Sequence, residues 1–272
     1  MKLCFIGGGN MASALIGGLI ARGQSATDIH VIEPFEAQRQ QLLRGFDVTV
    51  FERSTAQAID RDVIILAVKP QQMREAALAL APMLSGQLVI SVAAGIRIGD
   101  LSIWLGGHKR IVRAMPNTPA LIGAGITGAA GETGLTRADR DLTSAILSSV
   151  GECIWVETEA SLDAVTATSG SGPAYVFYFM EAMQNAARNL GLTEEQARLL
   201  TLSTFNGAAK LAAQASEPVS VLRERVTSKG GTTAAGLAAF EKGEIARHIE
   251  AGMQAANQRS IELGEEFGRS NR

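Results

Sequence analysis

A glycine-rich turn follows the first apolar segment of the chain and narrows its fold more than any other feature. Residues 3–6 are predicted to form a strand, and residues 11–22 carry a helical pattern that ends at Gly23. The turn between them, GGGNMA at residues 7–12, fits G-x-G-x-x-A. Its glycines let backbone N–H groups approach a pyrophosphate at the positive end of a helix. The segment therefore predicts a dinucleotide-binding domain, in preference to a turn with only a structural role.

The rest of the chain divides into an alternating half and a helical half. Short apolar runs alternate with helical patterns up to Trp155, which is typical of βαβ units that build a parallel sheet. Further strands are expected at residues 29–32, 62–68, 88–94 and 110–115, and a helix at residues 34–44. We predict an α/β chain, with an N-terminal Rossmann-type, mostly parallel sheet in residues 1–158 and an all-helical domain in residues 159–272. The apolar stripes of the helical half should complete their core against a second copy of the chain.

Composition excludes several classes of protein. The 272 residues carry a formal charge of −2 without a basic block, so a dedicated nucleic-acid binder is not expected. The longest aliphatic run, residues 63–68, is too short to cross a bilayer. No secretory signal opens the chain, and Cys4 and Cys153 form no close pair, so we expect a cytoplasmic protein with reduced thiols. The three histidines have no partner at ligand spacing, and we predict no metal site.

An acidic residue ends the second predicted strand. Glu33 lies 26 residues (33 − 7) past the first glycine of the turn. A carboxylate there accepts the ribose hydroxyls of an unphosphorylated adenosine and repels a 2′-phosphate, which favours NAD over NADP. Arg39, in the next helix, is a cation that can counter such a phosphate, and the alternative for Glu33 itself is a solvated acid at a strand end.

Four more segments have the residue types of a ligand site. AVKP at residues 67–70 and SVAAG at residues 91–95 end two predicted strands, where ligands bind in an open α/β sheet. SGSGPAY at residues 169–175 and TSKGGTT at residues 227–233 are flexible loops before helices, and their N–H groups and hydroxyls suit a carboxylate. These segments also have purely structural interpretations. Lys69 in AVKP is then a surface lysine before a helix. SGSGPAY and TSKGGTT are then ordinary capped helix starts.

Together with RAMPNTPA at residues 113–120, these segments resemble pyrroline-5-carboxylate reductase over essentially the whole chain. RAMPNTPA, SGSGPAY and TSKGGTT are specific to that family rather than to Rossmann proteins generally. The resemblance implies reduction of L-1-pyrroline-5-carboxylate to L-proline with NADPH or NADH, the last step of proline biosynthesis. It also implies a helical domain that interlocks into homodimers, which often build decamers.

The resemblance and the motifs give the following site residues. Cofactor contacts are expected from Gly7, Gly9, Asn10, Met11, Glu33, Ser54, Ala67, Val68, Lys69, Pro70, Val92, Ala93 and Ala94. Substrate contacts are expected from Glu159, Ser171, Gly172, Pro173, Gly230, Gly231, Thr232 and Thr233. The Thr233 hydroxyl would face the ring nitrogen and is the predicted catalytic group. Two residues depart from the family: Lys229 replaces a common proline, and Glu33 replaces a small polar residue, which weakens the expectation of NADPH and tilts it towards NADH.

A cyclic imine is basic enough to be partly protonated near neutral pH, so its reduction needs orientation more than a strong protein acid. Two other functions remain open from the sequence. One is a related imine or β-hydroxyacid reductase, although Lys210, the helical candidate for a catalytic lysine, follows neither G-x-x-x-K nor K-x-x-x-N. The other is a non-catalytic protein that senses a nucleotide or handles pyridoxal phosphate.

Overall fold

The computed structural model describes residues 1–269, which separate into two compact units. The first unit contains residues 1–171 and 255–269, and the second contains residues 172–254. This division differs from the predicted 1–158 and 159–272, because helix α7 (Ser161–Val165) packs on strands of the first unit and the end of helix α12 (Ile245–Arg269) belongs there too. One continuous helix thus contributes residues to both units.

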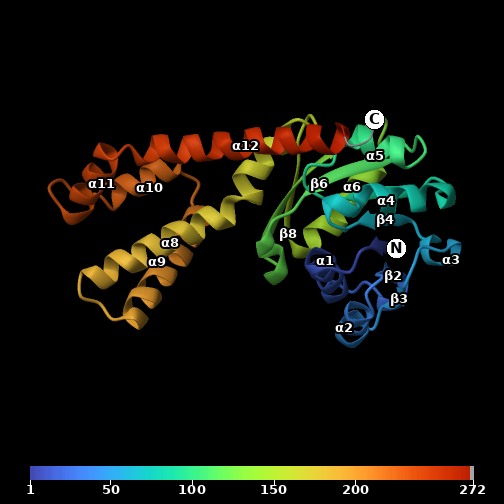
Figure 1. Ribbon diagram of the computed structural model, residues 1–272. Coiled ribbons are helices and arrows are strands. Elements are labelled where there is room, and N and C mark those ends of the chain that lie inside the picture. The colour runs from blue at the N-terminus through green and yellow to red at the C-terminus, as the bar shows by residue number, and fades with distance from the viewer. Residues whose placement is uncertain (270–272) are drawn as a thin grey trace. The chain divides into compact units, whose positions relative to one another are not determined.

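The first unit is built on an eight-stranded sheet with the order β3-β2-β1-β4-β5-β6-β7-β8 (Figure 1). The strands are β1 (Leu3–Ile6), β2 (Ile29–Ile32), β3 (Thr49–Phe51), β4 (Val63–Leu66), β5 (Leu88–Ser91), β6 (Ile111–Met115), β7 (Gly125–Gly131) and β8 (Gly151–Trp155). Every neighbouring pair is parallel except β6 and β7. The order reverses between β1 and β4, so the predicted Rossmann-type, mostly parallel sheet is confirmed.

Helices cover the sheet and make up the second unit. In the first unit they are α1 (Asn10–Ala21), α2 (Glu36–Phe46), α3 (Ala56–Ile59), α4 (Pro70–Leu80), α5 (Ile98–Trp104), α6 (Arg137–Leu147), α7 and the end of α12. In the second they are α8 (Gly172–Asn189), α9 (Glu194–Gln214), α10 (Val219–Arg225), α11 (Thr232–Lys242) and the start of α12. None of the described helices is long and apolar enough to cross a membrane.

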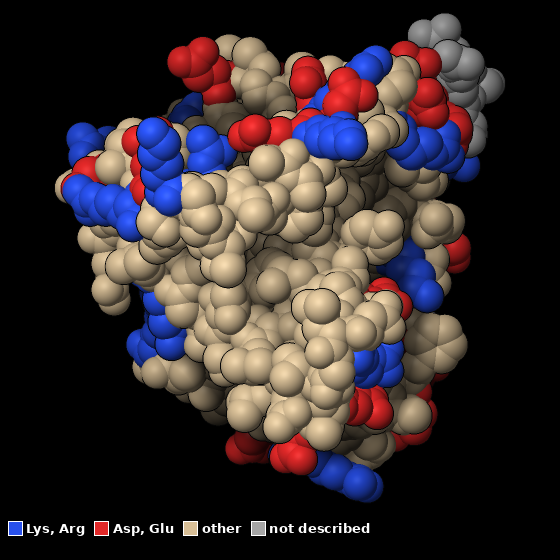
Figure 2. Space-filling model, turned by 90° about the vertical axis from the view of Figure 1, so that its left-hand side faces the viewer, with Lys and Arg blue, Asp and Glu red and all other residues tan. Residues whose placement is uncertain are grey.

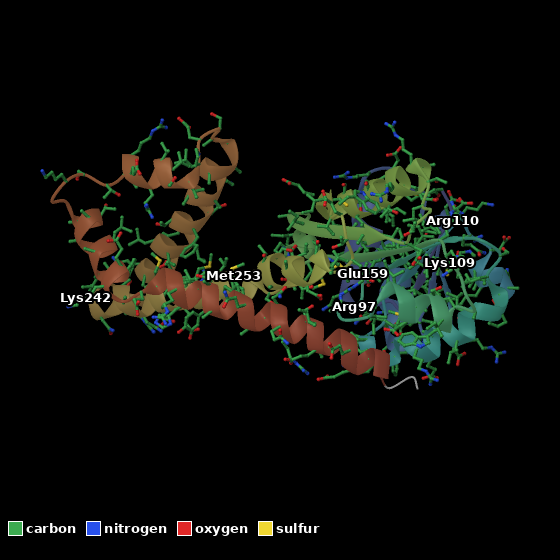
Figure 3. The ribbon with its side chains drawn as sticks, turned by 90° about the horizontal axis from the view of Figure 1, so that it is seen from above. Arg97, Lys109, Arg110, Glu159, Lys242 and Met253 are labelled. Carbon is green, nitrogen blue, oxygen red and sulfur yellow. The ribbon has the colours of Figure 1, made fainter. Side chains whose placement is uncertain are left out.

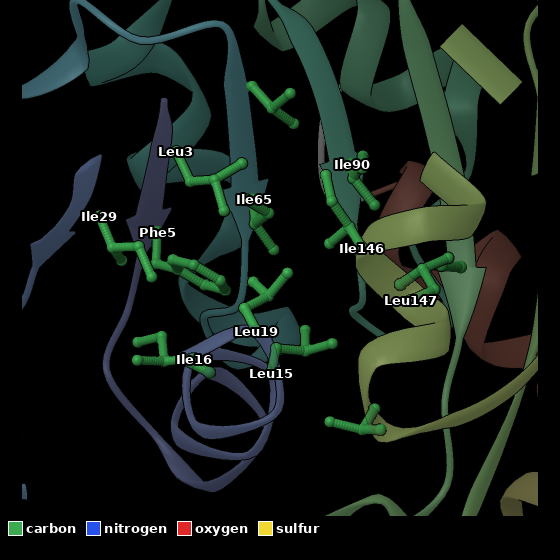
Figure 4. Close-up of a cluster of buried hydrophobic side chains, with 14 of the residues drawn as sticks. Leu3, Phe5, Leu15, Ile16, Leu19, Ile29, Ile65, Ile90, Ile146 and Leu147 are labelled. Atoms are coloured by element: carbon green, nitrogen blue, oxygen red, sulfur yellow. The ribbon is translucent and has the colours of Figure 1, made fainter. Parts of the chain in front are cut away.

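The sheet is buried on both faces, as its aliphatic strands predict. All four residues of β4 are fully buried, with Val63 and Ile65 in one apolar cluster and Ile64 and Leu66 in the other. Figure 4 shows side chains of β1, β4 and β5 facing α1 and α6 across the first cluster. Because successive side chains of a strand point to opposite faces, a strand covered on both sides must be apolar throughout.

One predicted loop is helical. The SGSG segment was expected to be flexible, but Thr166–Gly170 forms a π-helical turn between α7 and α8. The N–H of Ser171 donates to the carbonyl of Thr166 at 2.8 Å, and the Ser169 hydroxyl donates to the carbonyl of Val165 at 3.0 Å. The expectation of a loop was wrong because these bonds occupy backbone carbonyls that a serine- and glycine-rich sequence would otherwise leave to water.

The start of α6 is fixed by a buried carboxylate. Asp139, only 2% exposed, accepts from the N–H of Thr136 at 3.0 Å and from the Arg110 guanidinium at 2.5 Å. Its own N–H donates to the Thr136 hydroxyl, which completes a capping box. The hydrogen bonds from Arg110 and Thr136 hold the pKa of Asp139 below its usual value.

We expect Asp139→Asn to lower the free energy of unfolding by about 2 kcal/mol at pH 7, the size of a hydrogen bond to a buried charge. Because folding lowers the pKa of Asp139, this stabilisation is complete above the ordinary value of 3.8 and is lost as pH falls through the lower folded value. Urea unfolding at pH 7 and under acid conditions measures both. Asp141→Asn, which removes a 72% exposed carboxylate of α6, is the control, and a difference that stays constant with pH would contradict the assignment.

Candidate active site

The glycine-rich turn folds tightly against the end of β4. Gly7 has a φ of 97°, and a Cβ there would lie 2.9 Å from the carbonyl oxygen of Ala67. Only glycine fits this position. The turn therefore reaches the carboxyl edge of the sheet at the strand-order reversal and aims the start of α1 along that edge.

The N-terminus of α1 is open. Gly9 is its N-cap residue, no side chain caps it in the described chain, and a Cβ built on Gly9 meets nothing within 4 Å. Unpaired N–H groups at a helix N-terminus with free space before them are suited to an anion. The predicted pyrophosphate contacts Gly9, Asn10 and Met11 lie at this end, so the residues fit a dinucleotide.

Glu33 stabilises the same turn. Its Oε2 accepts from the N–H of Gly8 at 2.9 Å and its Oε1 accepts from the N–H of Phe35 at 3.0 Å, and the residue is only 7% exposed. A carboxylate accepts about four hydrogen bonds, so lone pairs remain for a ligand. Glu33 is thus both a structural link and a negative charge at the cleft, not a solvated acid.

Arg39 does not face the cleft. Its Nη1 donates to the carbonyl oxygens of Glu33 at 2.8 Å and Pro34 at 2.7 Å, and it also pairs with Glu36. These bonds hold the β2–α2 connection, so Arg39 is not available as the counter-charge to a phosphate that the sequence allowed.

A cleft of about 580 Å³ lies outside the carboxyl ends of β1 to β4. Seven of the predicted cofactor residues line it: Gly7, Gly9, Glu33, Ser54, Ala67, Val68 and Lys69. Pro70 is the first residue of α4, next to this lining, and Val92, Ala93 and Ala94 follow β5, the neighbouring strand. The position at the strand-order reversal is where dinucleotides bind in this type of sheet.

The cleft also contains residues that the sequence did not predict. Phe35, which is 65% exposed, and Arg53 both line it. Arg53 follows β3, a strand that we did not predict because it has only three residues at the edge of the sheet. Phe35 follows Glu33 by two residues, so the prediction of Glu33 as a cofactor contact at the end of β2 could have been extended to it.

Glu159, a predicted substrate contact, has a side chain that is 27% exposed and lies at the edge of a buried polar cluster. Its Oε1 accepts from the N–H of Ile98 at 2.8 Å and from Nη1 of Arg113 at 3.1 Å. Arg113 is 1% exposed, and burial lowers its pKa, which the Glu159 carboxylate opposes. Figure 3 shows Glu159 and Arg97 close together, and burial together with Glu159 raises the pKa of nearby Asp100. Glu159 therefore holds the start of α5.

The remaining predicted substrate residues, apart from Ser171, belong to the second unit. Gly172 and Pro173 begin α8, and Thr232 and Thr233 are the first residues of α11. Gly230 has a φ of 71°, and Gly231, the N-cap of α11, has no side-chain cap bond. The α11 N-terminus thus presents N–H groups and two hydroxyls together, as a carboxylate receptor requires. Among the described residues no cluster of His, Cys, Asp and Glu could hold a metal.

Known proteins match this chain over almost its whole length. Residues 159–263 match the family model described as pyrroline-5-carboxylate reductase dimerisation, and residues 2–95 match the one described as NADP oxidoreductase coenzyme F420-dependent. A pyrroline-5-carboxylate reductase of Pseudomonas aeruginosa is 44% identical over 98% of both chains. The solved pyrroline-5-carboxylate reductase of Coxiella burnetii is 39% identical, with a TM-score of 0.92 over 96% of this chain and 98% of that one. The Plasmodium falciparum enzyme, solved with NADP bound, is 30% identical, with a TM-score of 0.84 over 97% and 98%.

Gly9→Ala tests the open end of α1. A methyl group meets no protein atom there, so we expect the free energy of unfolding to change by no more than about 1 kcal/mol, the usual effect at an N-cap. It occupies the space of the incoming anion, so the KM for NADH and NADPH should rise about tenfold or more. Steady-state kinetics with a Gly45→Ala control, at a glycine of α2 that also has open space, measures this. An unchanged KM for both cofactors would contradict binding of the pyrophosphate at the N-terminus of α1.

Proposed function

The chain belongs to the pyrroline-5-carboxylate reductase family, and from this premise we propose how its residues bind and orient the reactants. It is an oxidoreductase with an NADP-binding type of domain that converts 1-pyrroline-5-carboxylate to proline in proline biosynthesis. The observation that carries the proposal is the N-terminus of α1, which has no side-chain cap and lies at the carboxyl edge of the sheet. Its N-cap residue, Gly9, has free space where a side chain would be. An assay that follows oxidation of NADH and NADPH with the cyclic imine tests it, and it also excludes a protein that only senses the nucleotide.

The cofactor extends along the carboxyl edge of the sheet in this proposal. The backbone of Gly9, Asn10 and Met11 binds the pyrophosphate with N–H groups and the helix dipole. The adenosine half lies over the ends of β2 and β3, where Glu33, Arg53 and Ser54 line the cleft. The nicotinamide half lies towards the ends of β4 and β5, near residues 67–70 and 92–94. When bound, the nicotinamide supplies the hydride.

Both NADPH and NADH are accepted in this proposal, and Glu33 favours NADH. Its carboxylate lies near the ribose position and repels a 2′-phosphate. Arg53 lines the same cleft and is the cation that offsets this repulsion. Arg39 does not take this role, because its guanidinium is hydrogen-bonded to the carbonyl of Glu33. The choice between the cofactors is therefore a balance between two charges at the adenosine end.

Thr233 and the two helix starts of the second unit orient the substrate. The N-terminal groups of α11, with Gly230, Gly231 and Thr232, bind the carboxylate, assisted by the segment from Ser171 to Pro173. The ring N–H of the protonated imine donates to the Thr233 hydroxyl oxygen, which stabilises the charged form. The protein's part in the reaction is then orientation, which can supply about 7 kcal/mol or more of the barrier.

The second unit acts as a dimerisation surface. In the described chain α8, α10 and α11 bury no residue, and large apolar side chains of this unit are exposed, among them Phe177 (64%), Tyr178 (70%) and Leu199 (63%). Figure 2 shows a broad face whose centre has few charged side chains, while Lys, Arg, Asp and Glu lie mostly at its margins. Apolar surface of this kind stabilises an oligomer. We therefore place the homodimer interface on this unit and keep the decamer as the larger assembly that such dimers form.

We expect Thr233→Ala to lower kcat/KM for the imine ten- to a hundredfold, the effect of losing one hydrogen bond to a charged group. Thr233→Ser keeps the hydroxyl and should restore most of the activity. Thr204→Ala, on an exposed position of α9, is the control. Full activity of Thr233→Ala in steady-state assays would contradict its role.

We expect Glu33→Gln to raise the ratio of kcat/KM for NADPH to that for NADH about tenfold, because a like charge a few ångströms from the phosphate costs about 1–4 kcal/mol. Glutamine keeps one oxygen to accept an N–H bond. Glu36→Gln removes a 64% exposed carboxylate outside the cleft lining and should leave the ratio as it is. Equal ratios in Glu33→Gln and the parent chain would count against a ribose contact.

A further inference from the structure

Three side chains from distant parts of the sequence meet in the first unit. Nη2 of Arg97 lies 2.8 Å from Oδ2 of Asp163, and the hydroxyl of Ser260 donates to Oδ1 of the same carboxylate at 2.7 Å. Asp163 is 3% exposed and Ser260 is 4% exposed. We call these three residues the latch. They join the connection between β5 and α5 to α7 and to the end of α12.

Two glycines make room for this arrangement. Gly264 lies inside α12, where glycine costs about 1 kcal/mol relative to alanine. A Cβ there would lie 2.5 Å from Nε of Arg97, so the guanidinium passes over a position without a side chain. Gly95 has a φ of 75°, and its Cβ would lie 3.3 Å from Leu263. The second half of the connection between β5 and α5, from Gly95 to Arg97, is therefore held against α12.

Net stability does not explain the latch. The side chain of Asp163 is 4% exposed and that of Arg97 is 23% exposed, so desolvation offsets much of their attraction, and apolar side chains of similar volume often stabilise a fold as well as such a pair does. A buried charged pair does fix one geometry, because its hydrogen bonds have strict lengths and directions. The segment whose geometry it fixes is residues 92–97, which leaves the carboxyl end of β5.

This segment adjoins the cofactor cleft. Strand β5 pairs in parallel with β4, with Ser91 beside Leu66, and the residues after β4, Ala67 and Val68, line the cleft. Because parallel strands end at the same edge, residues 92–94 lie at the nicotinamide end of the proposed cofactor position.

We propose that the latch positions residues 92–94 against the nicotinamide, so that Arg97, Asp163 and Ser260 are positioning residues for hydride transfer. This inference rests on the proposed function and goes beyond it, since it gives the end of α12 a part in the cofactor site. It predicts that breaking the latch impairs the nicotinamide half of the site and leaves the adenosine half intact.

The first test breaks the latch in two ways. Ser260→Ala removes one hydrogen bond to Asp163, and Gly264→Ala displaces the flexible Arg97 guanidinium while it improves the intrinsic helix propensity of α12. We expect each to lower kcat about tenfold with either cofactor, since small errors in position are costly. Both variants leave the buried Asp163 carboxylate with one partner fewer, so each should also lower the unfolding temperature. The loss of kcat is therefore compared with that of a control variant that lowers the unfolding temperature at a site away from the cleft.

Binding of ADP-ribose, which lacks the nicotinamide, supplies a readout independent of turnover. Calorimetry should give the parent Kd for both variants. Ser144→Ala is the matched control, because it removes the acceptor of the 2.9 Å hydrogen bond from Trp155 Nε1, in α6 and β8, away from the cleft residues. It should lower the unfolding temperature without lowering kcat. The double variant Ser260→Ala/Gly264→Ala should lose no more activity than the worse single variant, because both break one latch.

Two outcomes overturn the inference. If Ser260→Ala behaves as Ser144→Ala does, the latch is only structural. If ADP-ribose binding weakens together with kcat, the effect is on the whole unit. Should Ser260→Ala fail to fold, the inference is judged on Gly264→Ala alone, which leaves the hydrogen bond between Ser260 and Asp163 in place. If the parent chain oxidises neither cofactor with the imine, the proposed function itself fails, which is distinct from failure of the latch.

Discussion

The contact between the glycine-rich turn and the end of β4 governs the rest of the structure. Because Gly7 takes a left-handed backbone conformation against the Ala67 carbonyl, the chain turns sharply out of β1 and starts α1 at the sheet edge. The strand order reverses at the same place, so the positive end of α1 faces an open cleft. A side chain at Gly7 would push the turn away from β4, and the N-terminus of α1 would then no longer lie at the sheet edge.

Charges around this cleft serve the fold and the chemistry together. Glu33 accepts two backbone N–H groups and so fixes both the turn and the start of α2, yet it stays at the cleft surface. Arg39 holds the carbonyls behind it. A substitution of Glu33 therefore changes the stability of the turn together with the charge at the cleft, and a small residue in its place would leave two N–H groups to find other partners.

The two units differ in how they are stabilised. The first has apolar clusters on both faces of its sheet and a polar cluster that joins α5, α7 and α12. In the second, the residues described as buried are few, Ala197 and Thr201 among them, while large apolar side chains remain exposed. The first unit therefore contains its own core, and the second depends on association.

Apolar runs and helix-end residues in the sequence were enough to predict those elements whose formation depends mainly on residues close in the chain. The bounds of β1 and β2 were predicted as observed. The strand β7 was not predicted, because its glycine-rich sequence has no alternation and its antiparallel pairing with β6 comes from the sheet. The partners of Glu33 and the meeting of Arg97, Asp163 and Ser260 were likewise decided by tertiary structure. Hydrogen bonds between residues 66 and 97 positions apart leave no trace in a local pattern, since only the folded chain brings their atoms within reach.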